Sequence, residues 1–358
     1  MHTLLHTESS LGRGGQEIRT LAETRWLISH GWNALIACQP DSLLLREARA
    51  ASMPVESIRL RSGADVGALF RLRRLIRERG VSLVHTHSST DSWLGGMAAK
   101  SLGRPVVRSR HVSIPIRHTL VYRLADRIIT SGEAVRVTVI AAGIAAEKIV
   151  SVSAGVDTEQ FHPGVSGQSV RDELGLGGAP VVGLVANIRG SKGHNFFLDA
   201  ARTVLVAAPE TRFLIVGDGV GFEEVKARVQ QMGLQSRVHF TGFRRDVPQV
   251  MAALDVLVLP STRSEGTSQV ILQALAMGTP VVGSNGGGIP ELVRDGETGR
   301  LVPPGDSAAL ADAILAALRE PERARAMASD GQAMIRAQYT FDAAMARTTA
   351  VYRTLLDG

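Results

Sequence analysis

Two charged residues stand in polar loops that leave apolar runs and lead into stretches with helical spacing. Glu265 comes after the apolar run 256–259, and Lys192 comes after the apolar run 181–185. Loops at the carboxyl ends of parallel strands bind ligands in α/β proteins, and a helix N-terminus there favours an anion. We therefore expect an anion-binding site beside which a carboxylate and an ammonium group both lie.

The elements that must position these residues follow from alternating apolar runs and amphipathic stretches, which predict βα units on parallel sheets. In the first half we expect helices over 16–30 and 66–79 and strands over 2–6, 34–38, 83–85, 106–108, 127–130 and 149–152. In the second half we expect strands over 181–185, 212–216, 238–241, 254–259 and 281–283, and helices over 194–208, 307–319, 322–338 and 340–356. The predicted fold class is α/β, with two doubly wound parallel-sheet (Rossmann-like) domains facing a cleft.

The length of 358 residues suits two domains. We predict an N-terminal domain over 1–163 and a C-terminal domain over 164–340, with residues 164–178 as a connector at its start. A terminal helix over 341–358 is expected to pack back on the N-terminal domain.

Composition and charge narrow the function classes. The single cysteine, Cys38, excludes an intrachain disulfide, and neither a basic leader with an apolar core nor an apolar run of membrane-spanning length is present. The expected location is therefore the cytoplasm. Residues 1–163 hold 21 Lys and Arg against 14 Asp and Glu, whereas the remaining residues hold 19 against 20. This asymmetry predicts an anionic partner for the first half, and the few aromatic residues make nucleic acid the least expected one.

Ten segments in order along the chain carry a family resemblance. They are 12–15 (GRGG), 84–87 (VHTH), 105–111, 125–131, 153–163 (SAGVDTEQFHP), 185–193 (VANIRGSKG), 214–219 (LIVGDG), 238–243 (VHFTGF), 265–282 and 286–306. With them the chain resembles the retaining glycosyltransferases of the GT-B fold and of the family-four ("group 1") type over nearly its full length.

The resemblance implies a metal-independent hexosyltransferase-like enzyme without a cofactor. A nucleotide-diphosphate sugar of the UDP or GDP type would bind mainly to the second domain, and a glycan or lipid-linked acceptor mainly to the first. The expected role is retaining sugar transfer in cell-envelope polysaccharide or lipopolysaccharide synthesis. The sequence has no Asp-x-Asp pair of the kind that holds a metal and a diphosphate.

The same resemblance assigns the site residues. Glu265 and His111 would orient the donor sugar, and Lys192 would stabilise the leaving diphosphate, which makes these three the expected catalytic residues. The expected donor-binding residues are Gly14, Gly15, Asn187, Arg189, Gly217, Gly219, Phe243, Gly266, Thr267, Ser268 and Gln273. Two of them depart from the family pattern. Gln273 stands where a second glutamate is usual, and Asn187 stands where arginine is common, with Arg189 two positions later as a substitute cation.

Three points stay open at the level of sequence. A non-hydrolysing nucleotide-sugar epimerase and a nucleotide-sugar-binding protein without turnover are the alternative functions. Peripheral contact with the inner membrane face is a hypothesis based on the helix over 66–79, where Leu69, Leu72 and Ile76 form an apolar stripe among five arginines. His85 and His87 are not expected to bind a metal, because the pair has no support from a carboxylate or a third histidine.

Overall fold

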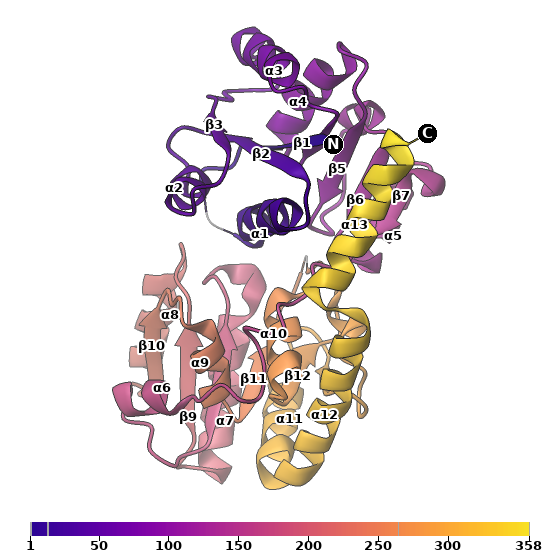
Figure 1. The fold of residues 1–358 in the computed structure, drawn as a ribbon. Helices are drawn as coiled ribbons and strands as arrows, with labels where there is room; N and C mark the ends of the chain where they lie inside the picture. Colours follow the sequence, from indigo (N-terminus) through magenta and orange to yellow (C-terminus); the bar gives the residue numbers. More distant parts are fainter. Residues whose placement is uncertain (1, 13, 264, 358) are drawn as a thin grey trace. The chain divides into compact units, whose positions relative to one another are not determined.

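The computed structural model describes residues 2–12, 14–263 and 265–357, and the chain divides into two compact units (Figure 1). The first unit comprises Met1–Ala154 and Ala344–Gly358, and the second comprises Gly155–Ala343. Arg13 and Ser264, which belong to two of the expected motifs, lie outside the described residues.

The first unit is built on a parallel seven-stranded sheet with the order β3-β2-β1-β4-β5-β6-β7. Its strands are β1 (Thr3–Glu8), β2 (Asn33–Cys38), β3 (Val55–Ser57), β4 (Leu83–Thr86), β5 (Val106–Arg110), β6 (Arg127–Thr130) and β7 (Ile149–Ser151). The chain reverses its direction of travel across the sheet between β1 and β4, so the loops that follow these two strands diverge there. This is the position at which doubly wound sheets hold ligands.

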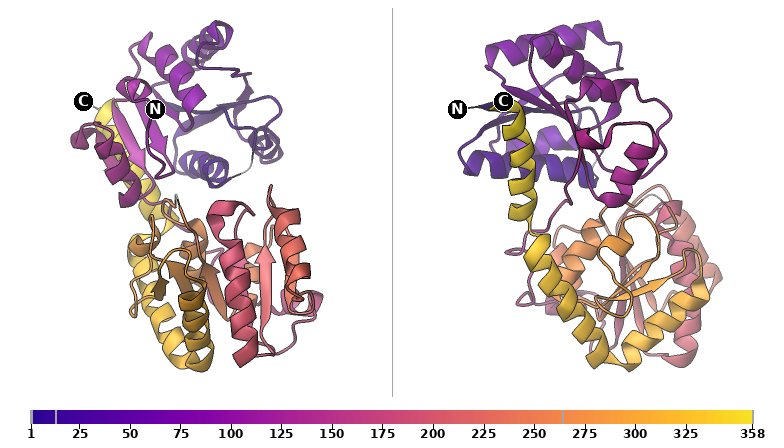
Figure 2. Two further views of the ribbon diagram at one scale, coloured as in Figure 1. Left: turned by 180° about the vertical axis from the view of Figure 1, so that it is seen from behind. Right: turned by 90° about the vertical axis from the view of Figure 1, so that its right-hand side faces the viewer.

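Helices cover both faces of this sheet (Figure 2). They are α1 (Gly15–Ser29), α2 (Leu43–Ala50), α3 (Val66–Glu78), α4 (Ser89–Lys100), α5 (Glu133–Ala141) and most of α13 (Phe341–Leu356), with 3-10 turns at Leu120–Leu124 and Ala146–Lys148. The α13 helix joins this unit through Tyr352, whose buried hydroxyl lies 2.7 Å from His85 Nδ1.

The second unit has a parallel six-stranded sheet with the order β10-β9-β8-β11-β12-β13. Its strands are β8 (Val181–Val185), β9 (Arg212–Val216), β10 (Val238–Gly242), β11 (Val256–Leu259), β12 (Val281–Ser284) and β13 (Arg300–Val302). Its helices are α6 (Gln168–Glu173), α7 (His194–Ala207), α8 (Phe222–Gln231), α9 (Val247–Ala253), α10 (Gln269–Met277), α11 (Ser307–Arg319) and α12 (Pro321–Gln338), with 3-10 turns at Gly190–Lys192 and Ile289–Glu291.

Alternate residues of the second sheet enter two different cores, as the pleat of a β-strand requires. Val181, Leu257 and Val281 pack with α9, α10 and α12, whereas Val182 and Val258 pack with α7, α8 and α11. Burial on both faces explains why these strands read as continuous apolar runs. The two predicted doubly wound parallel-sheet domains are confirmed.

Three elements differ from the expectation. β3 and β13 are three-residue edge strands that were not predicted, because neither segment is long enough to show a period. The expected connector over 164–178 contains α6, which forms because Val170 is buried in the core below α9 and α10.

Candidate active site

Lys192 and Glu265 meet at the point where the second sheet changes direction. Lys192 lies in the loop after β8, Glu265 lies in the loop after β11, and these strands are neighbours. Parallel neighbours present their carboxyl ends at one edge, so residues 73 positions apart in sequence become adjacent. The two residues singled out from the sequence therefore form one site.

The Lys192 ammonium group donates a hydrogen bond to Glu265 Oε1. The same oxygen accepts a hydrogen bond of 2.7 Å from the Ser261 hydroxyl. The side chains of Lys192 and Glu265 are only 15% and 11% exposed, so water screens this charge pair weakly. The pair offers an ammonium group to an anion and a fixed carboxylate to the hydroxyl groups of a ligand.

Backbone contacts fix the two loops to each other. The Thr262 N–H donates to the Ser191 carbonyl oxygen at 2.9 Å. Gly193 has a left-handed conformation with φ of 75°, and a Cβ atom there would lie 2.0 Å from the Pro260 carbonyl oxygen. Only glycine permits this approach, so Gly193 sets the distance between the loop of Lys192 and the loop of Glu265.

A third loop, after β12, supports Glu265. The Gly288 N–H donates to the Glu265 carbonyl oxygen at 3.1 Å, and the Ser284 hydroxyl donates to the Ser261 carbonyl oxygen at 2.5 Å. A Cβ on Gly287 would approach that same Glu265 oxygen to 2.7 Å. The glycine-rich segment 286–288 thus positions Glu265. Sequence reasoning missed Ser261, for which the only signal is that it is the first hydroxyl after the end of β11.

The helix that follows Glu265 begins as expected. The Ser268 side chain caps α10 by accepting from the Ile271 N–H, and Gly278 ends the helix in a left-handed conformation with φ of 73°. Gly266 is buried, and Thr267 and Gln273 are half-buried. An N-terminus of this kind carries a partial positive charge, which adds to that of Lys192.

The other expected donor-binding residues of this unit lie in the loops after β8, β9 and β10. Asn187, Arg189 and Phe243 are exposed. Gly217 and Gly219 approach the backbone after β8, because a Cβ on them would lie 2.0 Å from the Ala186 oxygen and 2.5 Å from the Ile188 oxygen, respectively. These two glycines hold the segment that carries Asn187 and Arg189.

His194, directly after Gly193, is a buried imidazole next to the site. Neither ring nitrogen has a hydrogen-bond partner among the described residues. Burial, assisted by the positive charge of Lys192, lowers the pKa of His194 from 6.5 to about 4. The neutral ring therefore avoids a second positive charge beside Lys192.

This shift predicts a loss of stability in acid. The unfolded chain protonates His194 below about pH 6.5 while the folded chain keeps it neutral down to about pH 4, so stability falls across that window. At 1.36 kcal/mol per pKa unit, the loss approaches about 3 kcal/mol. We expect urea unfolding from pH 7.5 to 4.5 to show a steeper loss for the wild type than for His194→Phe. The exposed His118→Phe should follow the wild type, and parallel curves for His194→Phe would contradict the assignment.

The remaining expected residues belong to the first unit. His111 follows β5, its carbonyl oxygen accepts from the Ser131 hydroxyl at 3.2 Å, and its ring stacks near His87 with centroids 5.8 Å apart. Burial and the charges of Arg19 and Arg110 lower the pKa of His111 to about 3, so the ring is neutral. Gly14 donates its N–H to the Glu17 carboxylate at 2.6 Å, and the exposed Gly15 begins α1.

Two carboxyl groups lie at the β1/β4 change of direction. Burial and the nearby Asp91 raise the pKa of Glu8 to about 8. Asp91 accepts hydrogen bonds from Thr7, Ser9 and the backbone of His87, and burial also raises its pKa. Both oxygens of Glu8 accept hydrogen bonds, from the Ser10 N–H and from the Gln16 amide, so neighbouring groups of the protein hold this buried carboxyl group in place.

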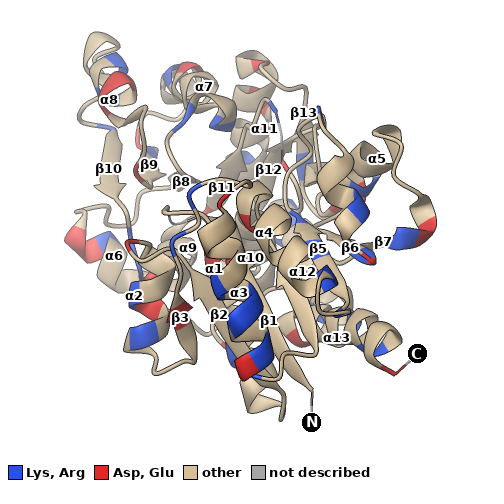
Figure 3. Ribbon diagram, turned by 90° about the horizontal axis from the view of Figure 1, so that it is seen from above, with Lys and Arg blue, Asp and Glu red and all other residues tan. Residues whose placement is uncertain are grey.

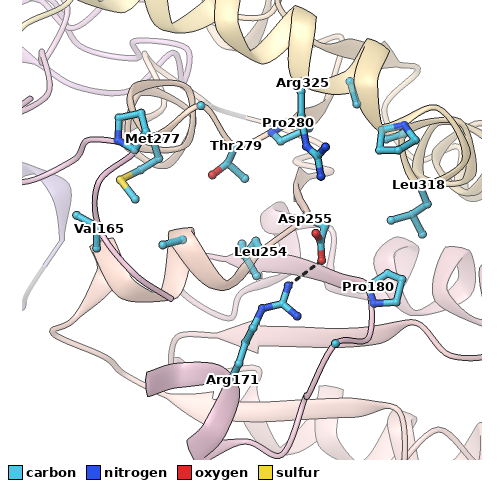
Figure 4. A pocket seen from close by; sticks show the side chains of 17 residues that line it. Val165, Arg171, Pro180, Leu254, Asp255, Met277, Thr279, Pro280, Leu318 and Arg325 are labelled. Carbon is cyan, nitrogen blue, oxygen red and sulfur yellow. Dashed lines mark hydrogen bonds and ion pairs between the residues drawn. The ribbon is translucent and has the colours of Figure 1, made fainter. Parts of the chain in front are cut away.

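A cavity of about 500 Å³ lies elsewhere in the second unit (Figure 4). Pro180, Asp255 and Pro280 line it, and each precedes a strand, so the cavity lies at the amino-terminal edge of the sheet, opposite Lys192 and Glu265. The Arg171 guanidinium donates to Asp255 at 2.9 Å within it. None of the expected site residues lines this cavity.

Two family models match this chain, one in each half. Residues 13–160 match the model of the family "Glycosyltransferase Family 4", and residues 179–320 match that of "Glycosyl transferases group 1". The GDP-mannose-dependent alpha-(1-6)-phosphatidylinositol monomannoside mannosyltransferase of Mycolicibacterium smegmatis is 30% identical over 73% of this chain and 74% of its own length.

Two further proteins extend the comparison. The alpha-D-kanosaminyltransferase of Streptomyces kanamyceticus is 31% identical over 52% of this chain, and the match spans about half (48%) of that relative's own length. The crystal structure of HepE of Anabaena in complex with UDP-glucose has a TM-score of 0.90 and 25% identity, and it covers 99% of this chain and 100% of its own.

Proposed function

Because the chain belongs to the group 1, family 4 glycosyltransferases, and so is an enzyme that transfers a sugar from a nucleotide sugar, we propose the finer course of its reaction. The sugar moves from a UDP- or GDP-linked donor to a glycan or lipid-linked acceptor of the cell envelope, and the anomeric configuration is retained. The observation that carries the proposal is the meeting of Lys192 and Glu265 at the change of direction of the second sheet.

We infer that the donor diphosphate binds beside Lys192 and the N-terminus of α10, where Gly266, Thr267 and Ser268 offer backbone N–H groups. Negative charge develops on the diphosphate as the glycosidic bond breaks, and a fixed cation stabilises that charge most in the transition state. Arg189 adds a second cation. The acceptor hydroxyl attacks the anomeric carbon from the same face that the diphosphate leaves. The leaving phosphate takes the proton of that hydroxyl, so no enzyme nucleophile is required.

Two side chains are proposed to orient the sugar. Glu265 accepts hydrogen bonds from sugar hydroxyls, because a carboxylate accepts several donors. His111, which is neutral, contributes a ring N–H or its backbone carbonyl oxygen. Asn187, Gln273, Phe243, Gly217 and Gly219 complete the donor site in this proposal, while Gly14 and Gly15 lie on the acceptor-side unit.

One experiment tests the reaction class. The protein is incubated with a panel of UDP- and GDP-sugars, with and without membrane extract, and the released nucleotide and the fate of the sugar are followed. Nucleotide release that requires extract, with the sugar recovered in a glycan or lipid, is the expected result. Isomerised nucleotide sugar without an acceptor would indicate an epimerase, and saturable binding without turnover would indicate a binding protein. Either result contradicts the proposal.

Gln273 is expected to be a tolerated replacement for the usual glutamate. Its amide oxygen can accept from ribose hydroxyls, and the positive N-terminus of α10 offsets the charge that Gln273→Glu adds. Isothermal titration calorimetry with UDP and GDP should give dissociation constants for Gln273→Glu that are equal to or lower than those of the wild type. Gln231→Glu, an exposed change on α8, is the matched control. Abolished binding in Gln273→Glu alone would show that the amide N–H is required.

The expected apolar stripe of α3 is occupied by the protein's own core, which corrects the sequence interpretation. Leu72 and Ile76 are buried and Leu69 is half-buried against the first sheet. The outer face carries the exposed Arg71, Arg74 and Arg77, together with Phe70, which is 63% exposed; the arginines of α3 are blue in Figure 3. No helix among the described residues is both long and apolar enough to cross a bilayer. We propose that this outer face rests on the anionic cytoplasmic leaflet.

Vesicle co-sedimentation tests this contact. Each arginine near an anionic surface contributes on the order of 1 kcal/mol, and salt screens that attraction. We expect recovery with phosphatidylglycerol vesicles at low salt, loss of recovery at high salt, and little recovery with phosphatidylcholine vesicles. Arg71→Glu together with Arg74→Glu should abolish recovery, while Arg347→Glu on α13 should not. Equal recovery with both lipids, or none with either, would contradict the proposal.

A further inference from the structure

Four buried side chains in the first unit form a cluster that the proposed transfer reaction does not use. His6 comes from β1, Glu23 from α1, His85 from β4, and His87 from the loop after β4. Each offers one donor atom, and these atoms all lie within 4.8 Å of one another. None of the four side chains is more than 4% exposed. The cluster therefore gives His85 and His87 a third histidine and a carboxylate, both from distant parts of the sequence.

Several polar atoms of the cluster have no partner among the described residues. His6 Nε2, His87 Nδ1 and Glu23 Oε2 are enclosed and make no hydrogen bond. Buried polar atoms are almost always paired, so three orphans in one cluster mark an incomplete set of partners. A cation held by the cluster would pair with Glu23 Oε2, because Arg19 already binds the other oxygen of that carboxylate.

We propose that His6, Glu23, His85 and His87 bind one zinc ion. Three imidazole nitrogens and one carboxylate oxygen are donors that Zn²⁺ accepts, whereas Mg²⁺ and Ca²⁺ prefer oxygen ligands alone. Four protein ligands complete a tetrahedral shell and leave no open position, so the ion is structural. The inference is independent of the sugar-transfer mechanism.

The spacing of the donor atoms is compatible with this ion. In a tetrahedral site with bonds of about 2.0 Å, ligand atoms lie roughly 3.3 Å apart. His6 Nδ1 and His87 Nε2 are 2.8 Å apart, and no two donor atoms of the cluster lie more than 4.8 Å apart. The required spacing falls between these values. When the zinc ion binds, its bonds replace the hydrogen bond between His6 and His87. The donor atoms that lie farther apart than about 3.3 Å move closer together.

Neighbouring groups already orient two of the ligands. The Arg19 Nε–H donates to Glu23 Oε1 at 2.5 Å, which leaves the other oxygen for the metal. The two ring nitrogens of His85 contact the Tyr352 hydroxyl at 2.7 Å and the Ser109 hydroxyl at 2.8 Å. One of these contacts remains when the other nitrogen binds the ion. Such outer partners fix ring orientation in known metal sites.

Metal content of the untagged, full-length protein is the direct test. The protein is produced with added zinc, dialysed against metal-free buffer, and measured by inductively coupled plasma mass spectrometry in the absence of nucleotide sugar. We expect about one zinc per chain in the wild type and in His118→Gln, which removes an exposed histidine of the same unit. Glu23→Gln keeps an acceptor for Arg19 but loses the carboxylate charge, and it should bind zinc at least about 10-fold more weakly.

A second measurement needs no variant, in case Glu23→Gln does not fold. Metal-free wild type is titrated with Co²⁺, and the visible absorption of four-coordinate cobalt is followed together with the melting temperature. Saturation at one equivalent with a raised melting temperature supports the site. Folded wild type that takes up neither zinc nor cobalt overturns the proposal, as does equal zinc in wild type and folded Glu23→Gln. Sugar transfer is assayed separately, so a failure here is distinguishable from a failure of the proposed function.

Discussion

Replacing Lys192 by alanine is expected to lower the turnover of sugar transfer by roughly 10²–10³-fold, the cost of removing one preorganised electrostatic stabiliser. The ammonium group is held by Glu265 in a position that water screens weakly, and a diphosphate beside it competes with the Glu265 carboxylate for its hydrogen bonds. The loss should appear mainly in kcat, because the charge on the leaving group is greatest in the transition state. Steady-state kinetics with the donor identified by the panel provide the measurement.

Three controls separate this effect from misfolding. Lys226→Ala removes an exposed lysine on α8 and should leave turnover unchanged. Lys192→Arg keeps the charge and should lose less than Lys192→Ala. Thermal unfolding of each variant shows whether the second unit is intact. Near-normal turnover in folded Lys192→Ala would show that Lys192 does not act on the donor diphosphate.

Gly193→Ala is expected to destabilise the second unit by about 4 kcal/mol. A left-handed conformation at a residue with a Cβ costs on the order of 1–3 kcal/mol, and forcing an atom into a filled space costs on the order of 1–3 kcal/mol more. The space is filled because the added Cβ would lie 2.0 Å from the Pro260 oxygen. Urea unfolding followed by circular dichroism measures the loss.

Substitutions at two other glycines separate the conformational cost of Gly193→Ala from the cost of the steric clash. Gly233 has a φ of 69° and nothing within 4 Å of a Cβ, so Gly233→Ala measures the conformational cost alone. Gly190 has neither a positive φ nor a near neighbour, and Gly190→Ala should be close to neutral. If Gly193→Ala loses no more stability than Gly233→Ala, the contact with Pro260 does not define the site.

The sequence predicts the local parts of the site well and the tertiary parts poorly. The ends of β8 and β11 are visible because buried parallel strands are unbroken apolar runs, and the cap at Ser268 follows from its residue type. The support of Glu265 by Gly288 is not visible, because a backbone contact between distant loops leaves no periodic signal. His6 and His87 are 81 positions apart, so the pattern around His87 gives no hint of its neighbour.

Helix α3 illustrates the opposite error. Its sequence shows an apolar stripe beside a basic surface, and this pattern is the same for a helix on a lipid surface and a helix on a sheet. The structure places Leu72 and Ile76 in the core, which leaves only the charged face for an external partner. The amphipathic pattern identifies the helix but not what covers its apolar side.

Because residues 344–358 belong to the same unit as residues 1–154, that unit has no complete core until the ribosome has made almost the whole chain. His85 emerges early, yet its partner Tyr352 is translated 267 positions later. At about 5–20 residues per second, the first sheet waits roughly 10–40 s for its last helix, while the second unit is complete as soon as it emerges. The C-terminal half of this chain is therefore able to finish folding first, and a gene cut after residue 154 would encode a permanently unfinished unit.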